Sequence, residues 1–184
     1  MTAAVPARFS PLHRLIHWVM AACILLMLFI GVGMVSTISV RYLELVSIHK
    51  PLGIAILVLA LLRVFVRLRH GAPPLPADLP VPMRLAAHLS HLALYGLMFA
   101  MPLLGWAMLS AEGFPVVLFE GVRLPPITPQ DTGLHALLRA AHGYLAYAFF
   151  AVILLHIGAG LFHALVRRDG VFEAMAPVPT RSVE

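Results

Sequence analysis

One uncharged stretch near the C-terminus decides the fold: AHGYLAYAFFAVILLHIGAG, which covers residues 141–160. It has the length that an α-helix needs to cross the hydrocarbon core of a bilayer, about 30 Å thick. Its two histidines, His142 and His156, are fourteen residues apart in sequence, which on a helix places them about 21 Å apart along the axis and within about 40° of one face. Ionisable side chains at such depths are costly unless they bind something. The stretch therefore predicts a transmembrane helix whose imidazoles hold two redox metals at two depths.

The composition of the whole chain is that of a membrane protein. Of its 184 residues, 61% are hydrophobic and only 11% are charged, whereas soluble domains carry roughly 25% charged residues. The formal net charge is +5, but the arginines lie beside apolar segments, so we interpret them as orienting the chain in the bilayer rather than binding nucleic acid. The single cysteine, Cys23, excludes an internal disulfide and an iron–sulfur cluster.

Four apolar segments predict a single-domain, all-α, antiparallel four-helix bundle in the membrane, with cofactors in its interior. The spans cover about residues 12–35, 48–67, 84–109 and 132–166. A Pro-rich connector covers residues 71–82, and a short polar tail, expected on the surface, covers residues 169–184. The first segment is too long for the apolar part of a cleaved signal peptide, so we expect it to remain as a span.

The basic residues are divided unevenly between the two sides of the predicted bundle. Four fall on the side away from the termini: Arg41, Lys50, Arg123 and Arg139. Nine fall on the side of the termini: Arg8, Arg14, Arg63, Arg67, Arg69, Arg84, Arg167, Arg168 and Arg181. Because cytoplasmic loops carry the excess of Lys and Arg, we predict that both termini and the Pro-rich connector lie in the cytoplasm.

This topology gives each histidine a depth and limits which ones can meet. A six-coordinate haem needs two axial nitrogens at one depth, from facing helices. His49 and His142 both lie toward the outer face and can meet there. His156 needs a partner on the cytoplasmic side, and by depth His17, His88 and His91 are all candidates.

Small residues near some of these histidines favour one choice. Positions i and i+4 share a helix face, so a flat macrocycle bound to a histidine would lie over the residue four positions later. Four histidines have a small residue there: Ala21 follows His17, Gly53 follows His49, Ala146 follows His142 and Gly160 follows His156. His88 and His91 are followed there by Leu92 and Tyr95, so the pattern favours His17 without excluding the others.

Several of these segments, taken as a set, resemble the bacterial cytochrome b561 family. They are LIHW at 15–18, IHKPLG at 48–53, AHLSHLALY at 87–95, and the spacing of His142, His156 and His163. The resemblance implies a four-helix inner-membrane protein with two non-covalent b-type haems, one held by His17 with His156 and the other by His49 with His142. It also implies electron transfer between the periplasmic side and the quinone pool. The best-understood type is similar to a superoxide oxidase, which takes an electron from superoxide and reduces ubiquinone.

The other polar residues give weaker hypotheses. His88, His91 and His163 are expected to bind a quinone carbonyl or relay protons to it, since imidazole titrates near neutrality; the alternative is contact with lipid headgroups or a haem propionate. Arg41 and Lys50 are expected to attract superoxide, because fixed positive charge concentrates anions, or else simply to solvate the interface.

Further haem contacts are assigned to basic or small residues beside the histidines: Arg14, Lys50, Gly53 and Arg139, with Arg63 and Arg67 as further candidates for binding propionates. His13, His70 and His135 are interpreted as surface or interfacial residues.

The function predicted from the sequence is therefore electron transfer across the bacterial inner membrane, as a superoxide:ubiquinone oxidoreductase. Two imidazoles per iron leave no open coordination position, so outer-sphere transfer is expected. An alternative is the cytochrome b anchor subunit of a periplasmic dehydrogenase or hydrogenase. A histidine-lined metal transporter fits less well, because the chain has only eight Asp and Glu residues.

Overall fold

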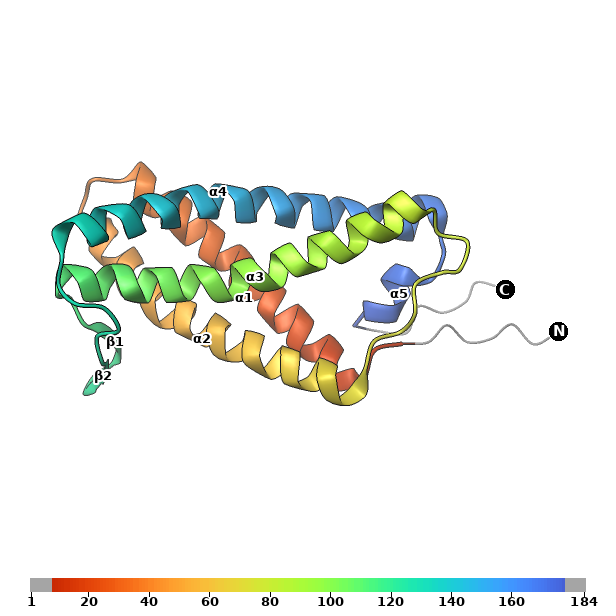
Figure 1. Cartoon of the computed structure of the whole chain (residues 1–184), viewed down its shortest axis with the longest axis horizontal. Helices are drawn as coiled ribbons and strands as arrows, with labels where there is room; N and C mark the ends of the chain where they lie inside the picture. The colour runs from red at the N-terminus through yellow and green to blue at the C-terminus, as the bar shows by residue number, and fades with distance from the viewer. Residues whose placement is uncertain (1–7, 178–184) are drawn as a thin grey trace.

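The computed structural model describes residues 8–177, and it is built around four long helices (Figure 1). These are α1 (Pro11–Ser36), α2 (Arg41–His70), α3 (Val81–Glu112) and α4 (Thr132–Phe162). A π-helical turn, η1 (His163–Arg167), continues α4 and is followed by a short helix, α5 (Val171–Met175). All four long helices are long and apolar enough to cross a membrane. The predicted all-α membrane bundle is confirmed.

The helix ends follow from local sequence. The Ser10 side chain accepts a hydrogen bond from the backbone N–H of His13 and caps α1, and Asp131 does the same for α4 through the N–H of Leu134. Such caps satisfy backbone donors that have no partner within the helix. α3 is capped at its C-terminus by Gly113, which has φ +86°, a left-handed conformation that glycine adopts without a steric cost.

Two elements differ from the sequence expectation. α2 begins at Arg41 rather than near residue 48, so Pro51 lies inside the helix. The added residues 41–47 include Arg41, Glu44 and Ser47 among apolar neighbours, and Glu44 in the first turn suits the positive end of the helix dipole. The loop after α3 contains an antiparallel hairpin of β1 (Val116–Phe119) and β2 (Val122–Leu124), which its proline-rich sequence did not suggest.

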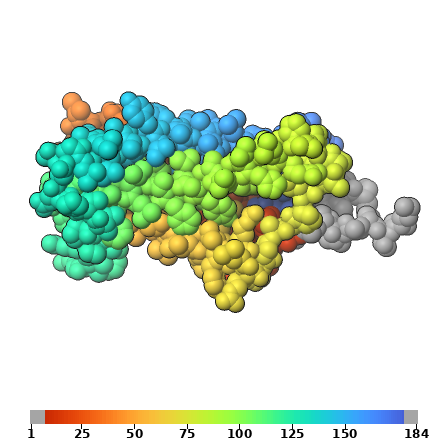
Figure 2. All heavy atoms as spheres, viewed as in Figure 1, coloured from red at the N-terminus to blue at the C-terminus, as the bar shows by residue number. Residues whose placement is uncertain are grey.

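The helices pack as two antiparallel pairs, α1 with α2 and α3 with α4, and the pairs meet most closely where α2 packs against α3. The end of the bundle that carries β1 and β2 is called the hairpin end. The opposite end is called the terminal end, because Phe9 and Ala174 meet there through a backbone hydrogen bond of 3.1 Å. Figure 2 shows the hairpin at one end of the elongated molecule and the Pro-rich connector at the other.

The buried core lies between the two ends. It is an apolar cluster to which all four helices contribute: Ile16, Met20, Ala60, Val66, Met98, Phe149 and Ile153. Most other large apolar side chains on the helices are exposed, as expected for a surface that faces lipid. Phe149 and Ile153 lie between His142 and His156 on α4. Packed apolar side chains therefore separate the two histidine levels.

The C-terminal segment is not the simple surface tail that the sequence suggested. Ala174 and Ala176 are buried. The indole N–H of Trp18 donates to the carbonyl of Met175 over 2.9 Å, and Arg14 donates to the carbonyl of Ala176 over 3.0 Å. Residues 171–176 therefore cover the first turns of α1. The rest of the expected tail, residues 178–184 with Arg181, lies outside the described residues.

Candidate functional site

Two pairs of histidines face each other inside the bundle, one near each end. At the hairpin end His49 of α2 faces His142 of α4, with ring centres 6.3 Å apart and ring planes at 64°. At the terminal end His17 of α1 faces His156 of α4, again with ring centres 6.3 Å apart, and with ring planes at 85°. The two levels that the sequence assigned to α4 therefore each receive a second imidazole from another helix.

The spacing within each pair suits one metal between two imidazoles. A metal–imidazole bond is about 2.0–2.1 Å long and the ring centre lies about 1.1 Å behind the nitrogen, so two trans rings have centres roughly 6 Å apart. Both pairs have this separation. Among residues 8–177 no group of three or more His, Cys, Asp or Glu side chains is arranged to hold a metal ion. A site with two imidazole ligands fits a haem, whose macrocycle supplies the other four nitrogens.

The pair at the hairpin end has buried ring nitrogens. The Nδ1 atoms of His49 and His142 are both buried, and neither has a hydrogen-bond partner among the residues that the structure describes. On α3, Gly105 lies against the ring of His142, because a Cβ atom at position 105 would be 3.4 Å from its Cε1. Sequence reasoning missed Gly105, since nothing in the sequence fixes the register of α3 against α4.

The pair at the terminal end has polar surroundings. Arg63 of α2 donates from Nη1 to Nδ1 of His17 over 2.6 Å and from Nε to the hydroxyl of Tyr95 over 3.1 Å. Its guanidinium also lies over the Tyr95 ring, 5.7 Å from the centre. His91 of α3 brings a third imidazole, with its ring centre 5.5 Å from that of His156. The sequence named Arg63 as a possible propionate ligand, but the contact with His17 was not foreseen.

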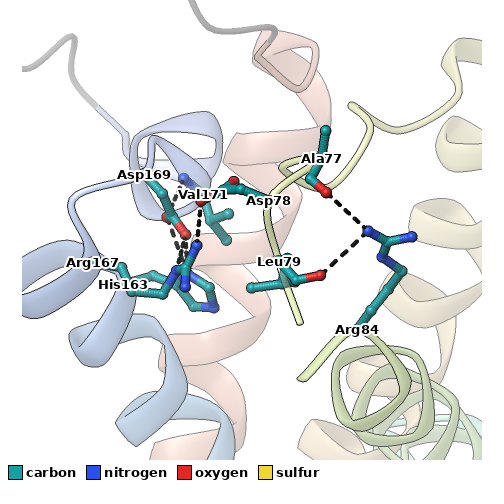
Figure 3. A network of polar contacts seen from close by, with 8 residues as sticks. All are labelled: Ala77, Asp78, Leu79, Arg84, His163, Arg167, Asp169 and Val171. Atoms are coloured by element: carbon teal, nitrogen blue, oxygen red, sulfur yellow. Dashed lines mark hydrogen bonds and ion pairs between the residues drawn. The ribbon is translucent and has the colours of Figure 1, made fainter. Parts of the chain in front are cut away.

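The three candidates for a quinone site are not brought together. His91 lies beside His156, whereas His88 is exposed and its Nδ1 bonds to the carbonyl of Arg84 over 2.7 Å. His163 belongs to a separate polar network, which Figure 3 shows. All three residues lie toward the terminal end of the bundle, but they do not converge on one pocket.

The network around His163 joins the end of α4 to the Pro-rich connector. Nδ1 of His163 donates to Asp169 over 2.8 Å, Nε of Arg167 donates to the same carboxylate over 2.8 Å, and Nη2 of Arg167 reaches Asp78 over 2.9 Å (Figure 3). The chain can return to His163 because Arg168 is left-handed, with φ +52°, directly after the π turn. Burial alone would raise the pKa of Asp169, but hydrogen bonds from Arg167 and His163 outweigh it and lower the pKa below its ordinary value.

His13 is not the surface residue that the sequence suggested. Its side chain is 1% exposed, and neither ring nitrogen has a hydrogen-bond partner among the described residues. Phe9 packs on its ring at 4.7 Å between centres. His70 is exposed as expected, and His135 bonds through Nδ1 to the carbonyl of Met108 over 3.1 Å.

The remaining candidates have ordinary surroundings. Arg14 bonds to the C-terminal segment, and Gly53 lies near the Met27 side chain. Arg41 and Arg139 are exposed and Lys50 is partly buried. Arg41 also lines a shallow pocket between the end of α1 and the start of α2, together with Glu44. These positions keep positive charge at the hairpin end.

Comparison with known proteins gives matches along nearly the whole chain. The family model described as prokaryotic cytochrome b561 matches residues 8–177. "Cytochrome b561 homolog 2" of Escherichia coli (strain K12) is 31% identical over 174 residues, which are 92% of each chain. "Cytochrome b561 homolog 1" of the same strain is 28% identical over 178 residues, 92% of this chain and 97% of the relative. "Probable superoxide oxidase CybB" of Yersinia pestis is 37% identical over 131 residues, 71% of this chain and 73% of the relative.

Proposed function

Because the chain belongs to the prokaryotic cytochrome b561 family of membrane electron-transfer proteins, which bind b-type haem, we propose that it carries electrons across the bacterial inner membrane through two haems b. The observation that carries this proposal is the repeated 6.3 Å separation of facing imidazoles at two levels of α4. When bound, each haem supplies reversible one-electron redox chemistry at its iron. The protein supplies the imidazole ligands, an environment that excludes water, and nearby charged side chains.

We assign His49 with His142 to the haem at the hairpin end, and His17 with His156 to the haem at the terminal end. His17 is preferred over His91 as the partner of His156 because its ring separation equals that of the other pair, whereas His91 is closer, at 5.5 Å. His88 is exposed and is assigned no role as a ligand.

The orientation that we propose places the terminal end in the cytoplasm and the hairpin end in the periplasm. Of the described Lys and Arg residues, eight belong to the terminal end and four to the hairpin end. This asymmetry supports the proposed orientation, because positive residues accumulate on the cytoplasmic side.

Quinone reduction is proposed at the terminal end, where His91 and His163 lie near the cytoplasmic surface. Reduction of a quinone to a quinol needs two electrons and two protons. Asp169 holds Nδ1–H of His163 and fixes the ring, which leaves Nε2 to hold a proton and donate it to a quinone oxygen. His91 lies closer to the ligand His156 and is the second candidate to bind the quinone head.

The electron donor that we propose is superoxide. The name of the Yersinia pestis relative, "Probable superoxide oxidase CybB", supports this choice, as does the positive charge of Arg41 and Lys50 at the hairpin end, which concentrates an anion. The balanced reaction takes two superoxide anions, one ubiquinone and two protons, and gives two molecules of oxygen and one ubiquinol.

The test uses the purified protein in detergent or liposomes. Reduced-minus-oxidised spectra with haem quantification should give two haems b per chain for the wild type and one for His142→Ala. A chemical source of superoxide should then reduce ubiquinone with the wild type and not with the variant. Haem-free wild type would overturn the proposal. Two haems without superoxide activity, but with activity once a periplasmic redox protein is added, would favour the anchor-subunit alternative.

A further inference from the structure

The β1–β2 hairpin has one face against the protein and one apolar face that is exposed. Val116 of β1, which packs against α2, is 3% exposed, whereas Val117 and Phe119 are 39% and 65% exposed. Phe119 pairs across the sheet with Val122, which is exposed as well. A two-stranded hairpin is only marginally stable by itself in water, and a contiguous exposed apolar patch marks an interaction surface. The outer face of the hairpin, formed by Val117, Phe119 and Val122, therefore indicates a partner.

Hydrogen bonds fix the depth at which the loop that carries the hairpin lies. The indole N–H of Trp106 donates to the carbonyl of Pro125 over 2.9 Å. The hydroxyl of Thr128 donates to the carbonyl of Ala107 over 3.0 Å. The chain therefore turns back directly after β2 and runs beside residues 106–107 of α3, instead of continuing away from the bundle.

Residues 106–107 lie close to the edge of the hydrocarbon core. Gly105, the residue before them, lies against the ring of His142. His142 and His156 are about 21 Å apart along α4. With the bilayer centred midway between them, His142 lies about 10 Å from the centre of a core whose edge is about 15 Å from its centre. Tryptophan is enriched at this level of membrane proteins, so the base of the hairpin lies at the lipid–water interface.

The hairpin extends sideways from the bundle at this depth. Figure 1 shows it beside the end of α3, across the long axis of the molecule rather than beyond its end. Because β1 packs against α2, the outer face continues the helix surface that faces lipid. Each strand of this two-stranded sheet has one edge without a β-partner among residues 8–177. Such edges are not tolerated in the hydrocarbon, but water and headgroups satisfy them at the interface.

We propose that the outer face of the hairpin, together with Phe114 and Ile127 of the flanking loop, binds the lipid interface of the leaflet at the hairpin end. Phe114 and Ile127 are 57% and 46% exposed, and apolar side chains of this kind insert at the boundary between headgroups and acyl chains. Arg123, which pairs with Val117 across the sheet, is exposed and long enough to reach lipid phosphates. A soluble redox protein would approach from the water beyond the end of the bundle, so the sideways direction of the hairpin favours lipid. The inference needs only the membrane-spanning bundle and no bound haem.

The test measures the depth of spin labels in the full chain reconstituted in liposomes. Cys23 is the only cysteine of the chain, so Cys23→Ala provides a background for single introduced cysteines. Phe119→Cys carries the label on the outer face. Two exposed positions of α4 serve as controls, Leu154→Cys near its middle for lipid and Thr132→Cys at its start for water. Power saturation compares collisions with oxygen, which concentrates in lipid, and with a nickel chelate, which stays in water. The oxygen-to-nickel ratio at position 119 should be several-fold higher than at position 132 and approach that at position 154.

Two results would overturn the proposal. A ratio at position 119 equal to that at position 132 would leave the outer face in water, available to a soluble partner. Few collisions with either reagent would show that protein covers it, such as a second copy of the chain. If Phe119→Cys does not fold, as judged by circular dichroism, Val117→Cys takes its place with the same expected ratio. Haem is not part of the readout, so a wild type without haem would refute the proposed function and leave this test valid.

Discussion

The two ends of the bundle present the same pair of imidazoles in very different surroundings. Both pairs have ring centres 6.3 Å apart. At the hairpin end the Nδ1 atoms of His49 and His142 have no partner among the described residues, whereas at the terminal end Arg63 bonds directly to His17. Helix packing therefore sets the ligand spacing, and neighbouring side chains set the charge. Because positive charge favours the reduced form of a centre, we expect the terminal end to have the higher potential, which would draw electrons from the hairpin end toward the quinone.

The largest effect should come from removing one ligand. His142→Ala should abolish haem binding at the hairpin end, leave the other haem in place and stop transfer from superoxide to quinone. His49→Ala should have the same spectrum, because both residues serve one group. Haem quantification and low-temperature difference spectra make the measurement. Loss of both haems from either variant would break the comparison, since the two pairs would then not be independent.

A bulky side chain on α3 should have the next largest effect, again only at the hairpin end. Gly105→Leu places atoms where a Cβ would already be 3.4 Å from the His142 ring, so the ring must move and most of this haem should be lost. Gly105→Ala should be tolerated. Gly96→Leu is the matched control, because a Cβ there meets nothing within 4 Å. Haem content of the three variants decides the matter, and full occupancy in Gly105→Leu would contradict the geometry.

Changing Arg63 should sharpen the electrostatic difference between the ends. Arg63→Gln removes the cation next to His17 and should lower the potential at the terminal end, with a reduced-to-oxidised ratio about tenfold smaller, or 59 mV. The potential of Arg63→Lys, which keeps the charge, should lie between those of the wild type and Arg63→Gln. Potentiometric titration resolves both haems, and an equal shift at the hairpin end would count against a local effect.

Asp169→Asn should slow quinone reduction about tenfold while leaving both haem spectra unchanged, because it loosens the ring that we propose donates a proton. The stability effect has a definite sign. The pKa of Asp169 is lowered in the folded protein, so its contribution is full above the ordinary aspartate pKa, about 4, and is lost as pH falls through the lowered value. Thermal unfolding of wild type and variant should therefore differ at pH 7 and converge in acid. A gap that does not depend on pH would contradict the role of this carboxylate.

Charge reversal at the hairpin end should have the smallest effect. The double variant Arg41→Glu and Lys50→Glu should reduce the rate of superoxide consumption about tenfold at low salt, and less at physiological salt, because steering is screened. Stopped-flow measurements at two ionic strengths test this. Arg84→Glu, at the terminal end, is the control and should not change the rate. Equal rates in the wild type and the double variant at low salt would exclude steering.

The sequence predicted those features that depend on a single helix. Apolar length placed the four spans, and the spacing of His142 and His156 placed two levels on α4. It could not predict what depends on how distant segments meet. His13 is buried under Phe9, whose backbone bonds to the distant Ala174, and Arg63 reaches His17 because of the register between α1 and α2. Likewise, the bond from Asp169 to His163 needs a left-handed Arg168 after a π turn, which no local pattern indicates.

The contact between the two chain ends has a consequence for biogenesis. Helix α1 leaves the ribosome well before residues 175 and 176, yet Arg14 and Trp18 complete their hydrogen bonds on the carbonyls of these two residues. Until residues 171–176 have been made, the terminal end of the bundle has no cover. Porphyrin insertion at this level therefore has a time window that closes when the C-terminal segment docks, and a nascent chain stalled before residue 170 should still exchange its pigment freely.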